Sequence, residues 1–410
     1  MKVILLSFMW GEAGGGSAAV PQMIATALRD KGIEVVVITT QPRAGMTVDR
    51  QAGIKFYRFR PPNLYWIGDK DKQHPLLKVL WQLIDIWNPF VYSTVKDILV
   101  KEQPDVVHVH KLRGLSPSVW RAARHAGCSR ILYTAHDYEL MSPEGTLTGR
   151  LGKWASQGMW LLRPYQWLRA IFSQNVHAVT APSRYTLEML TDRRFFPNAQ
   201  SQVVYNSHGW QRRALQQLRI QVETKRRSSE NQTDLHLLYL GRLERNKGVD
   251  ILCGAFVQAS KKVSNLRLSV AGYGTMADSL VTQYGDHPRI TFHGPLFGEA
   301  KAELLTDSDL VVLPSVWAEN APVVIPEAYA YGNPCIVAEI GGLPEFVTEN
   351  ETGYLVPSGD VSALVVLFEQ LAANPEQIAK MRANCYRRAE DFSVQAIIQA
   401  YLELYEAKDR

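Results

Sequence analysis

Two glutamates in the C-terminal half, Glu319 and Glu327, stand eight positions apart in the segment SVWAENAPVVIPEAYAYG. Pro322 opens the apolar run between them, and proline favours the first helical position, so we expect a helix to begin there. Glu319 would then follow the strand DLVVLPS and lie near helix N–H groups, which favour an anion. Two interpretations stay open. The acids could be a helix-dipole partner and a satisfied core acid, or two carboxylates that bind ligand hydroxyls.

Two cations follow another expected strand, in YLGRLERNKGVD. Arg242 and Lys247 flank a turn that leads into a helix at Gly248. A guanidinium fork, an ammonium and helix-end N–H groups can bind a diphosphate and stabilise its negative charge without a metal. The alternative is a pair of solvated surface cations. Gly272 and Gly274, in VAGYGT, follow the next strand and would let backbone approach a ligand closely.

The N-terminal half carries a glycine cluster, GEAGGGS, after its first apolar run. Gly15 and Gly16 could admit a ligand near a helix N-terminus, or they could serve only a tight turn. The cluster is not GxGxxG and no acid follows the second strand, which argues against an NAD site. His136 and Asp137, in TAHDYELMSP, could bind a hydroxyl or phosphate and orient a reacting group, or could simply structure a loop.

Metal-binding patterns are weak. His108 and His110 share one strand face in VVHVHK without an evident third ligand, so core histidines are the favoured interpretation. The single DxD, Asp69-Lys-Asp71, lies in a polar loop away from a strand end. No CxxC is present, which indicates no zinc site, no disulfide framework and a reduced cytoplasmic compartment. We expect no other metal and no cofactor. The four cysteines are widely spaced: Cys128, Cys253, Cys335 and Cys385.

Strands and helices are expected to alternate twice along the 410 residues, which indicates two doubly wound parallel-sheet domains. The run KVILLSFM is read as a buried first strand and not as a signal peptide. Residues 211–233 are polar and basic, and we expect a linker or mobile loop there. Residues 1–233 hold 31 Lys and Arg against 17 Asp and Glu, whereas residues 234–410 hold 14 against 23, so the two domains should differ in their partners.

In LGRLERNKG and SVWAENAPVVIPEAYAYGNPCIVAEIGGLPE the chain resembles family 4 of the retaining glycosyltransferases, which have the GT-B fold. The most specific part is the pair of glutamates separated by seven residues, with GGLPE downstream. The segments GEAGGGS, TAHDY, APS and VVYN occur in the family's order, so the resemblance covers nearly the whole chain. It implies an α/β protein with two Rossmann-like domains facing across a cleft. The expected divisions are an acceptor-binding domain at 1–207, a donor-binding domain at 208–392, and a terminal helix at 393–410 that packs on the first domain.

The resemblance also implies roles. The activity would be retaining, metal-independent transfer of a sugar from a UDP- or GDP-sugar to a glycan or lipid-linked acceptor, in exopolysaccharide, lipopolysaccharide or glycolipid assembly. His136, Glu319 and Asp137 would be catalytic. The donor-binding set would be Gly15, Gly16, Arg242, Lys247, Gly272, Gly274, Asn320, Ala321 and Glu327.

Two segments depart from the family pattern. VVYNSHGW lacks the usual NGVD-like continuation, and HDYELMSP lacks the cysteine common in related loops.

Two alternative functions stay open: a nucleotide-sugar epimerase of the same fold, and a non-catalytic sugar-nucleotide-binding protein. Product analysis would distinguish an epimerase from a transferase. A turnover measurement would distinguish a non-catalytic binding protein from a transferase.

The segment RLGKWASQGMWLLRPYQWLRAIF combines tryptophans with cations, a pattern typical of interfacial helices on anionic membranes. Plain core helices are the alternative, and HPLLKVLWQLIDIWNPFVY could add a second apolar surface. We expect no nucleic-acid partner and a place on the inner face of the cytoplasmic membrane. The residues expected to contact membrane or acceptor are Trp154, Trp160, Arg163, Trp167 and Arg169.

Overall fold

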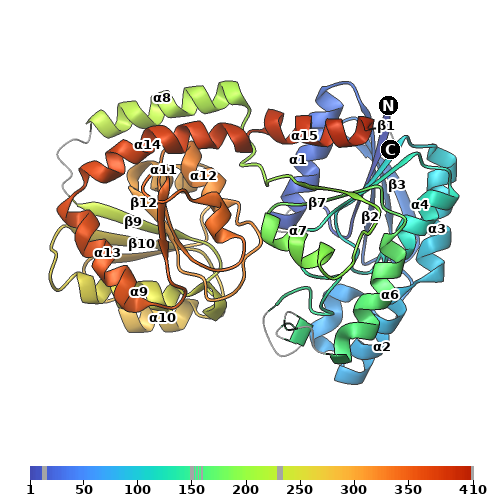
Figure 1. The fold of residues 1–410 in the computed structure, drawn as a ribbon, viewed down its shortest axis with the longest axis horizontal. Coiled ribbons are helices and arrows are strands. Elements are labelled where there is room, and N and C mark those ends of the chain that lie inside the picture. The colour runs from blue at the N-terminus through green and yellow to red at the C-terminus, as the bar shows by residue number, and fades with distance from the viewer. Residues whose placement is uncertain are drawn as a thin grey trace. The chain divides into compact units, whose positions relative to one another are not determined.

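A computed structural model describes residues 1–11, 16–147, 152, 154–155, 157, 160–228 and 234–407 (Figure 1). The chain divides into two compact units. Unit 1 comprises residues 1–205 and 398–410, and unit 2 comprises residues 206–397. Each unit has a sheet of its own, so each can be described by itself.

Unit 1 is built on an eight-stranded sheet in the order β3-β4-β2-β1-β5-β6-β7-β8. Its neighbouring strands are parallel, except that β3 runs antiparallel to β4. The strands are β1 (Lys2–Ser7), β2 (Glu34–Thr40), β3 (Met46–Gln51), β4 (Ile54–Phe59), β5 (Val106–Val109), β6 (Arg130–Thr134), β7 (Ala178–Ala181) and β8 (Gln200–Val203).

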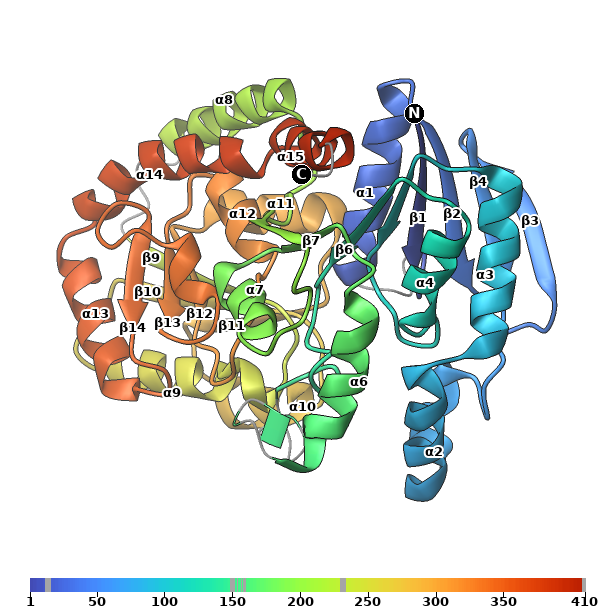
Figure 2. The same cartoon turned by 45° about the vertical axis from the view of Figure 1, so that its right-hand side comes forward.

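Helices cover both faces of this sheet, with α1 on one side and α3 and α4 on the other (Figure 2). The helical segments are α1 (Gly16–Asp30), η2 (Ile67–Lys72), α2 (Pro75–Ile86), α3 (Pro89–Glu102), α4 (Ser118–His125), η3 (Trp160–Leu162), α6 (Arg163–Ser173), α7 (Arg184–Thr191) and the end of α15 (Val394–Glu406).

The first apolar run forms the central strand β1, whose residues Val3–Leu6 are fully buried. This confirms the interpretation of the run as a strand. The hairpin β3–β4 was not among the expected elements, because the residues of β3 are mostly exposed and carry no apolar pattern. The four cysteines are buried and free.

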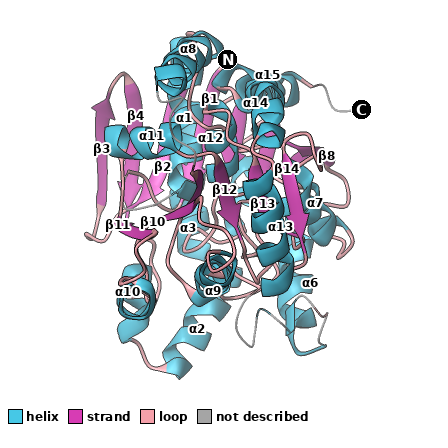
Figure 3. Ribbon diagram, turned by 90° about the vertical axis from the view of Figure 1, so that its left-hand side faces the viewer, coloured by secondary structure: helices cyan, strands magenta, loops and turns pink. Residues whose placement is uncertain are grey.

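Unit 2 has a six-stranded parallel sheet in the order β11-β10-β9-β12-β13-β14. Helices α9, α10 and α13 lie along one side of it, and α11, α12 and α14 along the other (Figure 1). Figure 3 marks the same strands by colour. The strands are β9 (Leu235–Leu240), β10 (Leu266–Ala271), β11 (Ile290–Gly294), β12 (Leu310–Leu313), β13 (Cys335–Ala338) and β14 (Gly353–Val356).

The segment expected to be a linker is instead helical, since residues Arg212–Ser228 form α8. Leu215 and Val222 are buried on one face of this helix. Arg219 extends that face by stacking on the Tyr386 ring, with its guanidinium carbon 4.9 Å from the centroid. The expectation failed because the helix buries few apolar residues, so its sequence lacks the continuous apolar stripe that marks a packed helix.

The other helical segments of unit 2 are η4 (Arg245–Lys247), α9 (Val249–Ala259), α10 (Ala277–Tyr284), α11 (Gly298–Asp307), α12 (Val324–Ala330), η5 (Leu343–Phe346), α13 (Val361–Ala373), α14 (Glu376–Ala389) and η6 (Glu390–Phe392). Among the described residues, no helix combines the length and hydropathy needed to cross a bilayer.

Candidate functional site

Glu319 lies in the loop after β12, and its carboxylate is nearly buried, with 9% of the side chain exposed. Three donors reach its Oε1 atom: Lys247 Nζ at 2.5 Å, Trp317 Nε1 at 2.8 Å and Ser315 Oγ at 2.9 Å. The Lys247 ammonium also lies over the Trp317 ring, 5.1 Å from its centroid. The loops after β9 and β12 therefore bring together two residues, Lys247 and Glu319, that are 72 positions apart.

Backbone contacts fix the loop that carries Glu319. The Gly342 N–H donates to the Glu319 carbonyl at 2.8 Å, and a Cβ on Gly341 would lie 2.6 Å from that same oxygen. Gly341 has a φ of +62°, which glycine adopts without cost. The GGLPE motif thus has a structural reason, because it allows one loop to pass directly against the backbone of another.

Glycine serves the same purpose beside Lys247. Gly248 has a φ of +68°, and a Cβ there would overlap the Pro314 carbonyl oxygen at 2.0 Å. The Val316 N–H donates to the Asn246 carbonyl at 3.0 Å, which joins the two loops a second time. The positions of Lys247 and Glu319 are therefore set by close backbone packing.

Glu327 is located in the first turn of α12, which begins at Val324 and not at Pro322 as expected. Both of its carboxylate oxygens accept from Lys301 Nζ on α11, at 2.6 and 2.7 Å. No local sequence pattern points to Lys301, because it lies 26 positions away on another helix. Each of the two glutamates thus has one lysine partner.

Arg242 lies exposed in the turn after β9. Its carbonyl accepts from the Tyr239 hydroxyl at 2.7 Å, which holds the turn in place. Gly272 and Gly274 pack against this turn, because Cβ atoms there would lie 1.7 Å from the Gly241 carbonyl oxygen and 2.4 Å from that of Leu243. These two glycines shape the turn that presents Arg242.

Asn320 and Ala321 follow Glu319, and Asn320 is buried. The Ala321 carbonyl accepts from Asn206 Nδ2 at 3.0 Å, which gives the asparagine of VVYN a contact inside unit 2. Ser207 and His208 continue that segment and bond to the carbonyls of Phe392 and Ala389, at 2.8 and 2.9 Å. The departure from an NGVD-like continuation thus leaves this segment firmly attached to unit 2.

In unit 1, His136 follows β6 and is half-buried. Its Nε2 lies 2.9 Å from His110 Nδ1, and the two rings stack with centroids 5.2 Å apart. Burial, followed by the positive charge of Lys111, lowers the pKa of His136 to about 4. His136 is therefore neutral at pH 7 and available for hydrogen bonding, but not as a cation.

Asp137 forms an ion pair with Lys111 at 3.3 Å, and its Oδ1 accepts from the Glu139 N–H at 2.9 Å. Burial alone would raise the pKa of Asp137, but the charges of Lys111 and Arg113 outweigh it and lower the pKa. Asp137 thus carries a negative charge and also structures its own loop.

His108 is a satisfied core residue, which confirms the favoured interpretation. Its Nδ1 lies 2.8 Å from the Tyr405 hydroxyl on α15, and its Nε2 lies 2.7 Å from Thr134 Oγ1. Burial lowers the pKa of His108 to about 3. Within the described residues, no group of three or more His, Cys, Asp or Glu could hold a metal ion.

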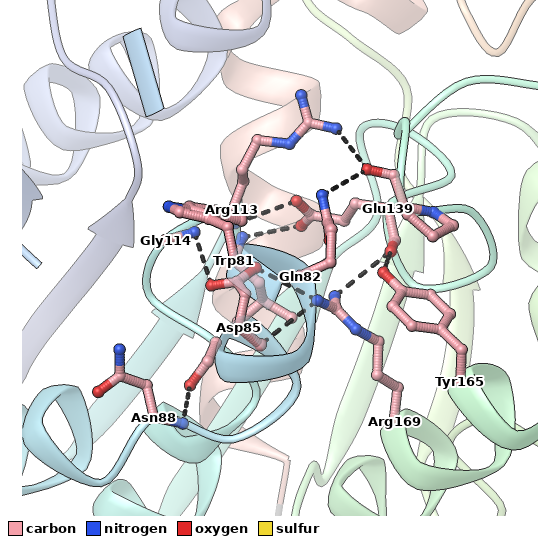
Figure 4. Close-up of polar contacts among 12 residues, drawn as sticks. Trp81, Gln82, Asp85, Asn88, Arg113, Gly114, Glu139, Tyr165 and Arg169 are labelled. Atoms are coloured by element: carbon pink, nitrogen blue, oxygen red, sulfur yellow. Dashed lines mark hydrogen bonds and ion pairs between the residues drawn. The ribbon is translucent and has the colours of Figure 1, made fainter. Parts of the chain in front are cut away.

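Arg169 does not share the surface expected for it, because it is 1% exposed inside unit 1. Its guanidinium pairs with Asp85 on α2 at 3.2 Å and donates to the Glu139 carbonyl (Figure 4). Tyr165 donates to the same carbonyl at 2.9 Å. The expectation failed because a helix with aromatic and cationic residues all around it does not reveal which face is buried.

The other residues expected to contact a membrane or acceptor differ in how exposed their side chains are. Trp160 and Trp167 are 70% and 64% exposed, and Arg163 is also exposed. Trp154 is half-buried. In the glycine cluster, Gly16 begins α1, whereas Gly15 lies outside the described residues.

A buried network in unit 1 was missed by sequence reasoning. The Glu139 carboxylate accepts from the backbone N–H groups of Leu112 and Arg113 at 2.8 and 3.2 Å, and Asp85 Oδ1 accepts from the Gly114 N–H at 2.9 Å (Figure 4). Burial raises the pKa of Asp85 to about 7, although the charge of Arg169 opposes this shift. The network holds the loops after β5 and β6 in place.

Two family models match the chain. The description "Glycosyltransferase Family 4" matches residues 14–207, and "Glycosyl transferases group 1" matches residues 221–391. A 42.6 kDa protein in the cps region of Klebsiella pneumoniae is 26% identical over 365 residues, or 84% of this chain and 87% of that protein. The putative glycosyltransferase EpsD of Bacillus subtilis is 26% identical over 346 residues, or 79% of this chain and 82% of EpsD.

Solved structures share the fold. Sucrose-phosphate synthase from Thermosynechococcus elongatus matches with a TM-score of 0.72 and 20% identity, over 99% of this chain and 98% of that one. HepE from Anabaena, solved in complex with UDP, matches with a TM-score of 0.70 and 20% identity, over 98% and 99%. The two parallel-sheet units thus have the GT-B architecture, and the chain belongs to the family 4 type of group 1 glycosyltransferases.

Proposed function

We propose that this protein is a retaining, metal-independent glycosyltransferase that moves a hexosyl group from a UDP- or GDP-sugar to a glycan or lipid-linked acceptor. The observation that carries the proposal is the Lys247–Glu319 pair at the end of β12, beside the turn that presents Arg242. The names of the cps-region and EpsD relatives, and the UDP bound to HepE, support a role with a nucleotide sugar in polysaccharide assembly.

The cations of unit 2 suit a donor diphosphate. Lys247 Nζ has three N–H donors and uses one on Glu319, so it can bind a phosphate oxygen while keeping that contact. Arg242 is exposed and offers a planar fork of donors. Together they would stabilise the charge that develops on the leaving diphosphate, which is the task a metal ion performs in other transferases.

The carboxylates suit the sugars of such a donor. Three donors on Oε1 hold the nearly buried Glu319 in one orientation, so that a sugar hydroxyl would meet a pre-positioned acceptor. Glu327 would bind the nucleotide ribose while its contact with Lys301 holds the carboxylate in place. In unit 1, neutral His136 would bind a hydroxyl of the reacting sugar, and the leaving phosphate would accept the proton of the acceptor during front-face attack.

The test is calorimetric titration with UDP, GDP, ADP and NAD, with EDTA present. We expect one nucleoside diphosphate to bind, and Arg242→Ala with Lys247→Ala to weaken that binding by about 100-fold. Arg245→Ala is the matched control, because Arg245 is an exposed cation in the same turn that is assigned no ligand. The donor-site assignment would be overturned if the protein bound only NAD or none of the four ligands. It would also be overturned if the double variant bound the nucleoside diphosphate as tightly as the unchanged protein.

We also propose that unit 1 binds the surface of an anionic membrane, on its cytoplasmic side. The Asp85–Arg169 pair joins α2 to α6, so these helices are neighbours. Exposed apolar side chains lie on α2, on η3 and on α6, and a groove that carries cations lies between α6 and the segment after α7. The apolar set is Leu76, Val79, Leu80, Leu83, Trp160 and Trp167, and the groove is lined in part by Arg163, Trp167, Ile171, Arg193 and Arg194.

Sedimentation with phosphatidylglycerol vesicles tests this surface. Replacing Trp160 and Trp167 by serine should reduce the bound fraction severalfold, because both rings are exposed and can enter the interface. Phe297→Ser in unit 2 removes an aromatic ring that is 76% exposed and should change nothing. Equal binding by all three proteins would contradict the proposal.

A further inference from the structure

Three cations of unit 1 are not used by the donor site: Lys111 and Arg113 both act on Asp137, and Lys70 is close enough to Arg113 for their charges to interact. Lys111 and Arg113 follow β5, and Lys70 lies in the last turn of η2. All three side chains are half-buried. In open parallel sheets, ligands bind at the carboxyl ends of the strands.

Two of the three cations keep most of their hydrogen-bonding capacity. Among the described residues, the Arg113 guanidinium donates only to the Pro143 carbonyl, at 3.4 Å (Figure 4). A guanidinium has five N–H donors, so most of this fork stays available. Lys70 Nζ has no hydrogen-bond acceptor within the described part of the chain, whereas Lys111 is paired with Asp137 at 3.3 Å.

Nearby carboxylates offset part of this positive charge, since Asp137 interacts with both Lys111 and Arg113. Burial and the positive charge of Arg113 lower the pKa of Lys70, although Glu144 and Asp71 oppose the shift and Lys78 adds to it. Asp137 is engaged by Lys111 and by the Glu139 N–H. Two half-buried cations that repel each other cost folding free energy, and a bound anion would repay that cost.

The surrounding structure holds Arg113 in place. Its backbone N–H donates to the Glu139 carboxylate at 3.2 Å, and Glu139 is fixed within the buried network of Asp85 and Arg169. Gly145 has a φ of +70°, and a Cβ there would lie 2.7 Å from Arg113 Nη2. The guanidinium therefore lies against backbone that only a glycine leaves open.

We propose that Lys70 and Arg113, with Lys111 beside them, bind a phosphate or diphosphate group carried by the acceptor. The inference rests on the proposed transferase function, because it assigns the acceptor's chemical class. Guanidinium and ammonium groups together match phosphate oxygens, and the charge of Lys111 acts on His136, the histidine expected near the reacting sugar. The acceptor is thus an anionic, phosphate-bearing molecule, either lipid-linked or free in solution.

Inorganic pyrophosphate is the first probe, titrated into the full chain carrying Arg242→Ala and Lys247→Ala. Those changes remove the donor-site cations, so binding reports on unit 1 whether or not the donor assignment is right. We expect binding that Lys70→Met or Arg113→Met weakens by about tenfold or more. Lys72→Met is the matched control, because Lys72 is 79% exposed and paired with Asp69 on the same short helix.

Two further measurements guard against misfolding. Lys70→Met should not lower the melting temperature, because it removes a repelled, half-buried charge, and Arg113→Lys should restore part of the binding. In an otherwise unchanged chain, Lys70→Met should leave nucleoside diphosphate affinity unchanged. Absent pyrophosphate binding, or equal loss in Lys72→Met, would overturn the proposal.

Two ligands distinguish a lipid-linked phosphate from a soluble one. One arm uses phosphatidylcholine vesicles containing a polyprenyl diphosphate-linked sugar, with plain phosphatidylcholine vesicles as the blank. The other arm uses glucose 1-phosphate in solution. Binding in either arm that depends on Lys70 and Arg113 supports the site and names the source, and binding in neither arm overturns it.

Discussion

The loops at the strand ends are held in different ways in the two units. In unit 2, backbone lies directly against backbone, with glycines at the contacts, as where Gly341 meets Glu319 and Gly248 meets Pro314. In unit 1, buried side chains hold the loops, chiefly Asp85, Glu139 and Arg169. A backbone clamp leaves little freedom in loop shape, whereas a side-chain network can be rebuilt around a different loop. This difference would suit the proposed donor site in unit 2 and the proposed acceptor site in unit 1.

The largest expected effect concerns Glu319. Glu319→Gln keeps a hydrogen-bond acceptor for Ser315 and Trp317 but removes the charge, so we expect turnover to fall by about 10²–10³-fold in the folded protein. A radiolabelled sugar-transfer assay checks this, with Glu339→Gln as an exposed control near the same strand ends. Near-normal turnover would remove Glu319 from the proposed site.

The network of unit 1 should be sensitive to the loss of one charge. Asp85→Asn keeps an acceptor for the Gly114 N–H but leaves the buried Arg169 guanidinium without its carboxylate, at a cost of about 3 kcal/mol. Chemical denaturation measures the loss, and hydrogen exchange should show it in residues 110–118 and 137–145. Adding Arg169→Met to Asp85→Asn should recover part of the lost stability. If the stability losses of the two single variants simply added in the double variant, the two residues would not act as a pair.

The close backbone contacts of unit 2 should leave no room for an added methyl group. Gly341→Ala places Cβ 2.6 Å from the Glu319 carbonyl oxygen and should cost about 2–4 kcal/mol. Gly359→Ala, at a φ of +83° with no described atom within 4 Å, should cost only the conformational strain of about 1 kcal/mol. The difference between their melting temperatures isolates the clash, and equal shifts would show that the loops are not clamped.

Buried histidines should make both units sensitive to acid in the same way. Burial lowers the pKa of His108 to about 3 and that of His236 to about 4, against about 6.5 when unfolded. Below pH 6.5 the unfolded chain binds more protons, so stability is present above that pH and is lost as pH falls toward 4. His108→Gln and His236→Gln should each reduce this slope by at most about 1.4 kcal/mol per pH unit. Unchanged slopes would mean that these histidines are already protonated in the folded chain.

Regular patterns made much of the fold predictable. Continuous apolar runs such as KVILLS and LHLLYL became buried parallel strands, because strands covered on both faces leave no position for polar residues. The hairpin β3–β4 and helix α8 were missed for the opposite reason. The hairpin strand β3 is largely exposed, and α8 buries few apolar residues, so neither carries the expected apolar pattern.

The sequence by itself determined the alternation of strands and helices, the family, and the loops that carry Glu319, Lys247 and His136, because these depend on local order and spacing. Only the tertiary structure decided which side chains meet: Lys301 with Glu327, His110 with His136, and Asp85 with Arg169. It also placed Arg169 inside unit 1. Partners from distant segments depend on how strands are ordered in a sheet and which helix face is buried, and no local pattern records either.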